Sequence, residues 1–150
     1  MLYSKSTGRI VELLNSLLGT IGQDIIENNK AMHLYDVNWE NYVKIDVKTE
    51  YSVLMNIEIS DSGMSLGIDH FEEAFSWGLQ DIIDNHNEIF SMLKMLLTSF
   101  VEVKSYGKKY KIVSFINSDG KKLYVKTLIN GVFSNIFAQK IETYKPIFQT

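Results

Sequence analysis

The sequence contains one candidate nucleophile, Ser65, in the middle of residues 63–67 (GMSLG). A Gly-x-Ser-x-Gly run can hold a serine on a strained turn between a strand and a helix, where an acid and a histidine activate it. Asp84 and His86 follow in the order that this chemistry uses. The apolar residues on either side of Ser65 alternate with polar or small ones, as in the interior of a strand. We therefore expect Ser65 on the polar face of a strand, without a catalytic partner.

A second polar group has the composition of a metal site. His70 lies among Asp69, Glu72 and Glu73, and His86 is a further candidate ligand. However, Asp69 and Glu72 have the spacing of a capping box, and a helix N-terminus favours acidic side chains in any case. We prefer the capping role and predict no metal and no cofactor. The absence of cysteine excludes thiolate ligands, disulfides and cysteine nucleophiles.

Lysines and tyrosines alternate in the last third of the chain, an arrangement that lets a sheet stack bases and hold phosphates. The only arginine is Arg9, so this region lacks the bidentate groups that read guanine. The protein is acidic overall, with a net charge of −3, and we predict that nucleic acid is not its partner. The residues concerned are Lys104, Tyr106, Lys108, Lys109, Tyr110, Lys111, Lys121, Lys122, Tyr124 and Lys126.

Charge is divided unevenly along the chain. Residues 1–100 hold six basic and fifteen acidic side chains, a net charge of −9, whereas residues 101–150 hold nine basic and three acidic ones, a net charge of +6. No basic residue lies between Lys48 and Lys94. Such asymmetry says more about binding partners than about fold.

The acidic interval predicts a surface that meets a basic protein and speeds the encounter by electrostatic steering. Trp77 lies within this interval, and tryptophan is enriched at binding hot spots. The alternative is a solvated surface whose charge is neutralised by the lysine-rich strands. The predicted partner-binding residues are Glu58, Asp61, Asp69, Glu72, Glu73, Trp77, Asp81, Asp84 and Glu88.

Hydrophobic periodicity predicts the elements that would carry these residues. The spacing is helical over residues 9–28, and alternates as in a three-stranded meander over residues 42–68. Two helices are expected next, at 69–84 and at 89–100, the second apolar on nearly every side. Three strands follow, and residues 132–144 fit either a closing helix or a strand.

This order predicts an α+β fold in one domain of residues 1–150. We expect an antiparallel sheet of about six strands, with the N-terminal helix and the two central helices packed on it. Leu93 and Leu96 should be core residues. The chain start has no secretory signal, and its most apolar stretch is far shorter than the ~20 residues of a membrane span, so we predict a cytoplasmic protein without membrane contact.

The small size, the missing cysteine and the acidic block at residues 50–88 resemble the immunity proteins of polymorphic or contact-dependent bacterial toxin systems. Those proteins occlude basic toxin domains, often nucleases, with an acidic patch. The resemblance implies an antitoxin that inhibits by protein–protein interaction and is not an enzyme.

The order of helices and strands is also similar to type III secretion chaperones, which bind unfolded effector segments as dimers. We therefore rank the functions as an immunity-type inhibitor, a secretion chaperone or adaptor, and a small serine hydrolase using Ser65. The sequence leaves open the partner's identity and activity, the oligomeric state, and whether the acidic or the lysine-rich face binds.

Overall fold

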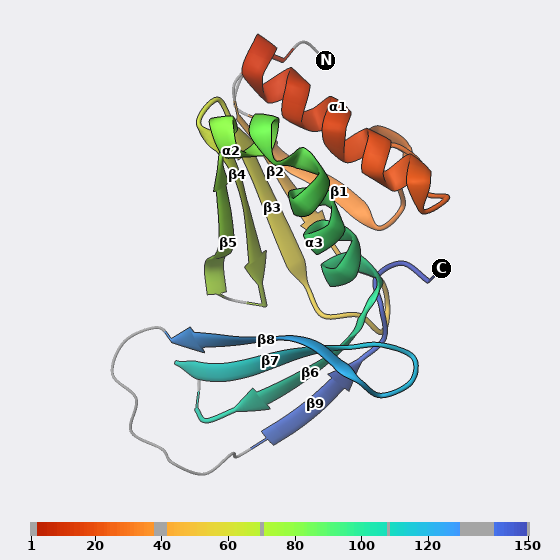
Figure 1. Ribbon diagram of the computed structural model, residues 1–150. Coiled ribbons are helices and arrows are strands. Elements are labelled where there is room, and N and C mark those ends of the chain that lie inside the picture. The colour runs from red at the N-terminus through yellow and green to blue at the C-terminus, as the bar shows by residue number, and fades with distance from the viewer. Residues whose placement is uncertain (1–2, 38–41, 70, 108, 130–139, 150) are drawn as a thin grey trace.

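The computed structural model describes residues 3–37, 42–69, 71–107, 109–129 and 140–149, which form two antiparallel sheets and their helices (Figure 1). The first part contains α1 (Lys5–Thr20), a 3₁₀ turn η1 (Ile26–Asn28), β1 (Met32–Val37), β2 (Tyr42–Val47), β3 (Met55–Ser60), β4 (Gly63–Ile68), β5 (Phe71–Gly78), α2 (Leu79–Asp84) and α3 (His86–Thr98). The second part contains β6 (Phe100–Ser105), β7 (Tyr110–Ile116), β8 (Lys122–Ile129) and β9 (Lys140–Tyr144).

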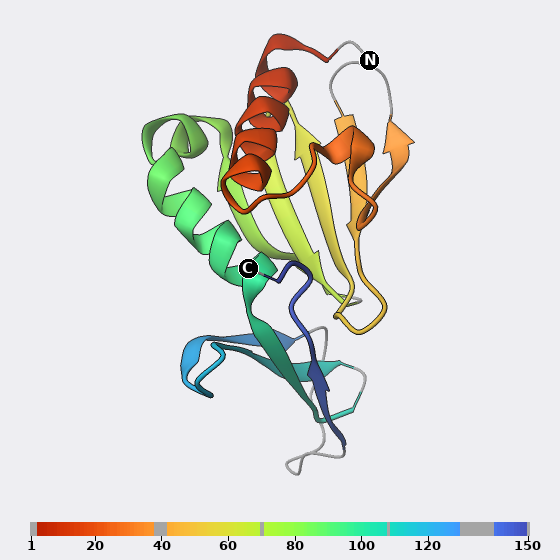
Figure 2. The same ribbon diagram turned by 90° about the vertical axis from the view of Figure 1, so that its right-hand side faces the viewer.

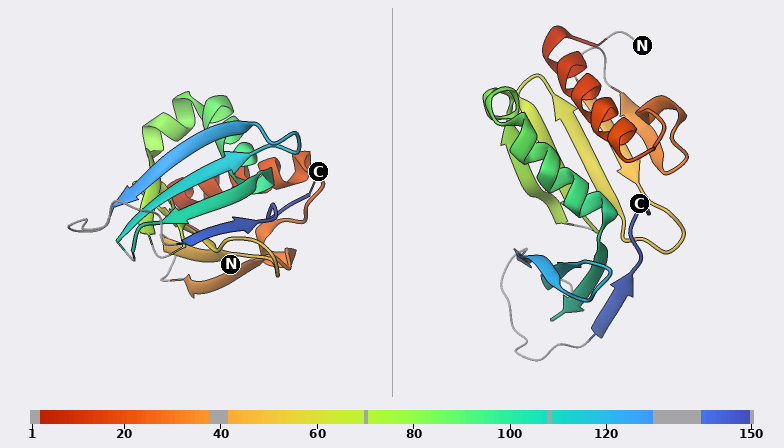
Figure 3. Two further views of the ribbon diagram at one scale, coloured as in Figure 1. Left: turned by 90° about the horizontal axis from the view of Figure 1, so that it is seen from below. Right: turned by 45° about the vertical axis from the view of Figure 1, so that its right-hand side comes forward.

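The first sheet is a five-stranded meander in the order β1-β2-β3-β4-β5. Its apolar residues alternate strictly: Val43, Ile45 and Val47 of β2 are fully buried, and the residues between them are half-buried. Both α1 and α3 cover the apolar face, as the right-hand view of Figure 3 shows. The opposite face is polar, and there Lys44 pairs with Glu58 across β2 and β3 at 3.5 Å.

Helix α1 begins four residues earlier and ends eight residues earlier than the periodicity predicts. Ser4 caps it by accepting a 3.2 Å hydrogen bond from the backbone N–H of Thr7. The helix ends where Gly22 takes a positive φ of 72°, a conformation that glycine adopts readily. Ile26 continues the apolar pattern but belongs to η1, where it is buried and its N–H donates to the Asn15 side chain at 2.9 Å.

The predicted helix over residues 69–84 is wrong, because residues 71–78 form strand β5 and only Leu79–Asp84 is helical. The β4–β5 register explains the error. Leu66 pairs with Phe75 and Ile68 with Phe71, so β5 holds two more residues than β4 over this distance. The bulge places two buried phenylalanines four residues apart, which is the spacing of one helix face.

The second predicted central helix is confirmed as α3, with bounds two or three residues earlier than expected. Leu93 and Leu96 are fully buried, so the prediction that they belong to the core is confirmed. The carbonyls at the end of α3 receive local donors, since Thr98 and Ser99 donate their hydroxyls to the carbonyl oxygens of Lys94 and Met95.

The second sheet has four strands in the order β8-β7-β6-β9 and lies at one end of the first sheet, below it in Figure 1 and again in Figure 2. The α+β class is therefore confirmed, whereas one sheet of about six strands is wrong: the described residues form nine strands in two sheets. Strand β1 was missed, because residues 32–37 lack strict alternation. Of the uncertain segment 132–144, residues 140–144 form strand β9, and residues 132–139 lie outside the described part.

Candidate functional site

The structure brings three of the predicted partner-binding residues to one end of the five-stranded sheet. Asp81 and Asp84 lie on α2, Glu88 lies in the first turn of α3, and all three are exposed. We call this group the acidic end. It adjoins the β3–β4 turn, because the N–H at the start of α2, on Leu79, donates to the carbonyl oxygen of Ser62 at 2.9 Å.

The carboxylates of the acidic end are held only by neutral groups. Asp81 accepts a 2.7 Å hydrogen bond from the Asn85 amide, and Asp84 accepts a 2.9 Å hydrogen bond from Gln80. Within the described part of the chain, no lysine or arginine forms an ion pair with Asp81, Asp84 or Glu88. Among the described residues, their negative charge is therefore not neutralised by a direct ion pair.

Asp61 lies near this end but has a structural role. Its carboxylate accepts hydrogen bonds from the hydroxyls of Ser4 and Thr7, which ties the β3–β4 turn to the start of α1. These two hydrogen bonds lower the pKa of Asp61, because they stabilise the ionised form.

The remaining predicted acids lie elsewhere. Glu72 and Glu73 are the exposed bulge residues of β5, toward the other end of the strand, and Glu73 has a positive φ of 51°. Glu58 lies on the polar sheet face beside Lys44. The nine predicted residues therefore do not form one continuous surface.

Trp77 connects β5 to the acidic end, since it lies two residues before α2. Its ring is half-buried and stacks on Phe75 with the centroids 6.1 Å apart and the planes 12° apart. Phe75 in turn contacts the rings of Phe115 and Tyr124 in the second sheet. Trp77 is thus part of a ring cluster that packs against the core, with one side accessible.

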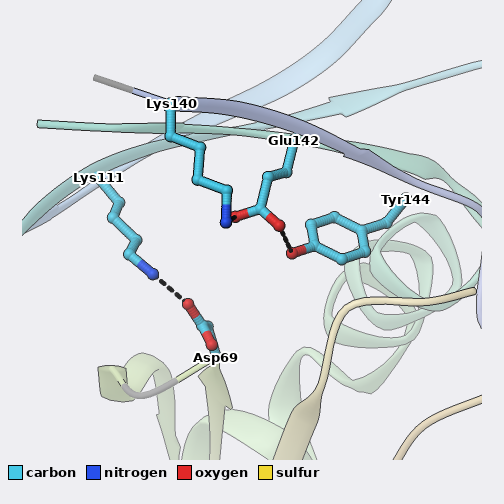
Figure 4. A network of polar contacts seen from close by, with 5 residues as sticks. All are labelled: Asp69, Lys111, Lys140, Glu142 and Tyr144. Atoms are coloured by element: carbon cyan, nitrogen blue, oxygen red, sulfur yellow. Dashed lines mark hydrogen bonds and ion pairs between the residues drawn. The ribbon is translucent and has the colours of Figure 1, made fainter. Parts of the chain in front are cut away.

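Asp69 joins the two sheets rather than capping a helix. Its backbone has a positive φ of 57°, and its carboxylate pairs with the amino group of Lys111 on β7 (Figure 4). Nearby on β9, Glu142 pairs with Lys140 at 3.3 Å and accepts a 3.0 Å hydrogen bond from the hydroxyl of Tyr144. This junction could not be predicted, because its other members lie 42 to 75 residues after Asp69 in the chain.

The polar groups of this junction stabilise the contact between the two sheets. Burial, followed by the hydrogen bond to Glu142, raises the pKa of Tyr144 to about 12. The pKa of Tyr3 is also raised, chiefly by burial, whereas that of Asp61 is lowered. None of these shifts moves a group toward neutral pH, which is what a general acid or base needs.

The lysine-rich strands do not present one continuous basic platform. Lys111 and Lys126 point toward the first sheet, with their amino groups 5.9 Å and 5.2 Å from the ring centroids of Phe71 and Phe75. Their stems cover apolar surface while their charges contact aromatic rings and the Asp69 carboxylate. Tyr124 also faces inward, against Phe75, and is not placed to stack a base.

Ser65 lies in the interior of β4, paired with Glu58 on one side and Ser76 on the other. Met64, Leu66 and Ile68 point to the core side, so the side chain of Ser65 points to the polar face, as predicted. This position is not a turn between a strand and a helix. In the described part of the chain, Ser65 and His86 form no hydrogen bond with each other, and Nδ1 of His86 lies 3.4 Å from the carbonyl oxygen of Ile83.

Among the described residues, no group of three or more histidines and acids could hold a metal ion; His70 lies outside this part of the chain. No helix described here is long and apolar enough to cross a membrane.

The chain matches no protein-family model, and neither a curated protein nor a solved structure shows significant similarity to it.

Proposed function

We propose that the protein is a binding protein of the immunity type, which inhibits a basic partner by covering it with the acidic end. The observation that carries this proposal is the match between charge and architecture. The residues up to 100, with a net charge of −9, build the five-stranded sheet and its helices, and residues 101–150, with a net charge of +6, hold the four-stranded sheet.

This division makes the molecule electrically polar in space as well as in sequence. Part of the opposite charge meets at the junction, where Lys111 pairs with Asp69. The acidic end has no such partner in the described part of the chain and lies at the other end of the first sheet (Figure 1). A basic protein approaching this end would be attracted over about one Debye length, roughly 8–10 Å at physiological salt.

The proposed interface combines Asp81, Asp84 and Glu88 with Trp77. The carboxylates would steer the encounter, and the half-buried indole would supply an apolar contact at the centre. The resemblance to immunity proteins implies that the basic partner would be a bacterial toxin domain, of which a nuclease is one kind.

The test is a triple charge reversal, Asp81→Lys, Asp84→Lys and Glu88→Lys, measured by surface binding kinetics against a basic protein that co-purifies with this chain or is the product of a neighbouring gene. We expect the association rate constant to fall by about tenfold or more at low ionic strength, and the loss to shrink as salt is raised. Trp77→Ala should instead raise the dissociation rate constant.

The matched control reverses three exposed acids elsewhere, Glu12→Lys, Asp24→Lys and Glu27→Lys, which changes the net charge by the same amount. If the two triple variants slow association equally, net charge acts rather than this surface. If both leave binding intact while Lys109→Glu and Lys122→Glu abolish it, the basic sheet is the working face and the proposal fails.

A secretion chaperone or adaptor is the second candidate, favoured by one observation. Five large apolar side chains of the four-stranded sheet are exposed, and none of the described helices covers the outer side of this sheet in the view from below (Figure 3). An adaptor would use such a surface to hold an unfolded segment of another protein. The five exposed apolar residues are Phe100, Leu123, Val125, Ile129 and Ile141.

A further inference from the structure

A groove of about 700 Å³ lies where α3 passes into β6. The C-terminal turns of α3, the β7–β8 turn and the segment after β9 form its walls. Its apolar lining comes from Met95, Phe100, Leu123 and Pro146, which belong to four different parts of the chain.

A second groove, of about 560 Å³, adjoins the first and shares Phe100 and Lys145 with it. It adds Tyr51, from the turn before β3. The side chains of Phe100, Leu123 and Tyr51 are 42%, 45% and 62% exposed. Large apolar side chains gathered in a concave surface and left open to water are typical of a site that another chain covers.

The charges around the first groove have one sign. Lys94 and Lys145 line it, and no carboxylate is among its described lining residues. The second groove adds Lys48 and Glu50, which offset each other. A ligand with negative charge beside an apolar group therefore complements the first groove, and a basic ligand does not.

Two of the polar groups within the lining already have partners. The hydroxyls of Thr98 and Ser99 donate to backbone carbonyls of α3, at 2.6 Å and 2.5 Å. An apolar side chain entering the groove would therefore displace water from a lining that requires few new hydrogen bonds.

The walls are held in place by the fold. The N–H of Phe148 donates to the Leu97 carbonyl oxygen at 3.0 Å, and the N–H of Lys145 donates to the Tyr51 carbonyl oxygen at 2.9 Å. Ile147 and Phe148 are buried and anchor the C-terminal wall. The groove is therefore formed before a ligand arrives, which reduces the entropy lost on binding.

We propose that this groove binds a segment of another protein in which a leucine or an aromatic side chain is flanked by carboxylates. The apolar side chain would lie between Met95, Phe100 and Leu123, and the carboxylates would contact Lys94 and Lys145. The site is separate from the acidic end and takes the opposite charge. It does not depend on the function proposed above, since an inhibitor and an adaptor could each carry it.

The probes are fluorescein-labelled octapeptides built from leucine, phenylalanine and aspartate in three different orders. Each has three controls, in which lysine replaces aspartate, asparagine replaces aspartate, or serine replaces the apolar residues. Fluorescence anisotropy with the full chain measures binding. We expect saturable binding of at least one acidic peptide below about 1 mM, with each matching control at least tenfold weaker.

Variants locate the site. Phe100→Ser and Leu123→Ser should each weaken binding of that peptide by about tenfold or more, and Lys94→Gln should weaken it less and only at low salt. The matched controls are Ile141→Ser, a more exposed apolar residue of the same sheet outside the groove, and Lys5→Gln at the start of α1. Unchanged thermal unfolding of each variant verifies its fold.

The proposal is overturned if no acidic peptide binds, if the lysine peptides bind as well, or if Ile141→Ser weakens binding as much as Phe100→Ser. It is also overturned if the groove is occupied by a second copy of the chain. In that case sedimentation would show a dimer that Leu123→Ser dissociates, and no peptide would bind to the dimer.

Discussion

The two sheets of this protein treat their uncovered faces in opposite ways. The five-stranded sheet turns polar side chains such as Lys44 and Ser65 away from its helices, whereas the four-stranded sheet turns Val125, Ile129 and Ile141 toward solvent. Its inward face includes Lys111 and Lys126 beside Val103 and Phe115, which are almost fully buried.

The difference between the two sheets follows from what packs against each face. Helices α1 and α3 present apolar stripes, so the first sheet needs apolar residues on that side alone. The second sheet packs against the end of the first sheet, which offers aromatic rings and the Asp69 carboxylate. Lysine stems pack on these rings, and the lysine amino groups contact the rings or the carboxylate. On the other side of the second sheet, Val125, Ile129 and Ile141 are exposed.

We expect the largest loss of stability from a substitution in the core between the five-stranded sheet and its helices. Leu96→Ala should lower the free energy of unfolding by about 2–5 kcal/mol, because Leu96 is a fully buried residue of α3 and the truncation leaves a cavity. Val125→Ala, in the open face, should change it by less than about 0.5 kcal/mol. Urea unfolding measures both. Equal losses would show that the face of the second sheet is covered in solution and that the contrast drawn here is wrong.

A second effect tests the close approach of strands in the first sheet. A Cβ atom at Gly67 would lie 2.0 Å from the Asn56 side-chain oxygen and 2.9 Å from the carbonyl oxygen of Phe71. Because the second of these is backbone, Gly67→Ala should cost about 1–3 kcal/mol, as overpacking does. Gly19→Ala is the control, since no atom lies within 4 Å there and helix propensity improves. A Gly67→Ala protein as stable as the parent in thermal unfolding would mean that β4 and β5 lie farther apart.

The junction between the sheets gives a smaller effect. Asp69→Asn removes the charge that pairs with Lys111 but keeps a residue type that tolerates a positive φ. We expect a loss of about 1 kcal/mol, because the pair is partly exposed and solvent screens it. Lys111→Met should cost no more, since its stem still covers Phe71. A double variant that loses the sum of the two single effects would show that the pair does not couple the sheets.

The smallest effect depends on pH. The pKa of Asp61 is lowered in the folded protein by the hydroxyls of Ser4 and Thr7, so its ionised form favours folding. This contribution is full above the unfolded value, about 4, and is lost as pH falls through the lower folded value. Asp61→Asn should therefore lower the melting temperature slightly at neutral pH, and the difference should vanish toward pH 2. A difference in melting temperature that grows on acidification would contradict this stabilising role of ionised Asp61.

Much of the fold could be predicted, namely the elements whose sequence pattern depends only on which face is buried. The sequences of β2, β3 and β4 alternate because one face of the sheet packs against helices and the other carries polar or small side chains, and α3 was recognisable from the apolar residues that it buries, among them Leu93 and Leu96. Strand β5 could not be read in this way. Its two-residue bulge mimics helical spacing, and Asp69 looks like a cap but takes a left-handed conformation and binds Lys111.

The candidate site was predictable in part for the same reason. The charge of Asp81, Asp84 and Glu88 follows from composition, and their exposure follows from their helical positions. What one sequence cannot show is which other acids have partners: Glu58 pairs with Lys44, Asp69 with Lys111, and Asp61 binds Ser4. The groove beside Phe100 was missed because its lining comes from four separate segments.

The bulge in β5 has a consequence for how the molecule behaves at high concentration. A meander has two free edges, and each could in principle pair with the edge of another molecule to extend the sheet without limit. Here both edge strands are irregular: the register of β5 shifts between Leu66 and Ile68, and that of β1 shifts against β2 between Leu34 and Asp36. The bulge of β5 also places the carboxylates of Glu72 and Glu73 beside its edge, where a second copy would meet like charge. The bulge that made β5 hard to recognise in the sequence therefore also opposes the edge-to-edge pairing of sheets that leads to fibres.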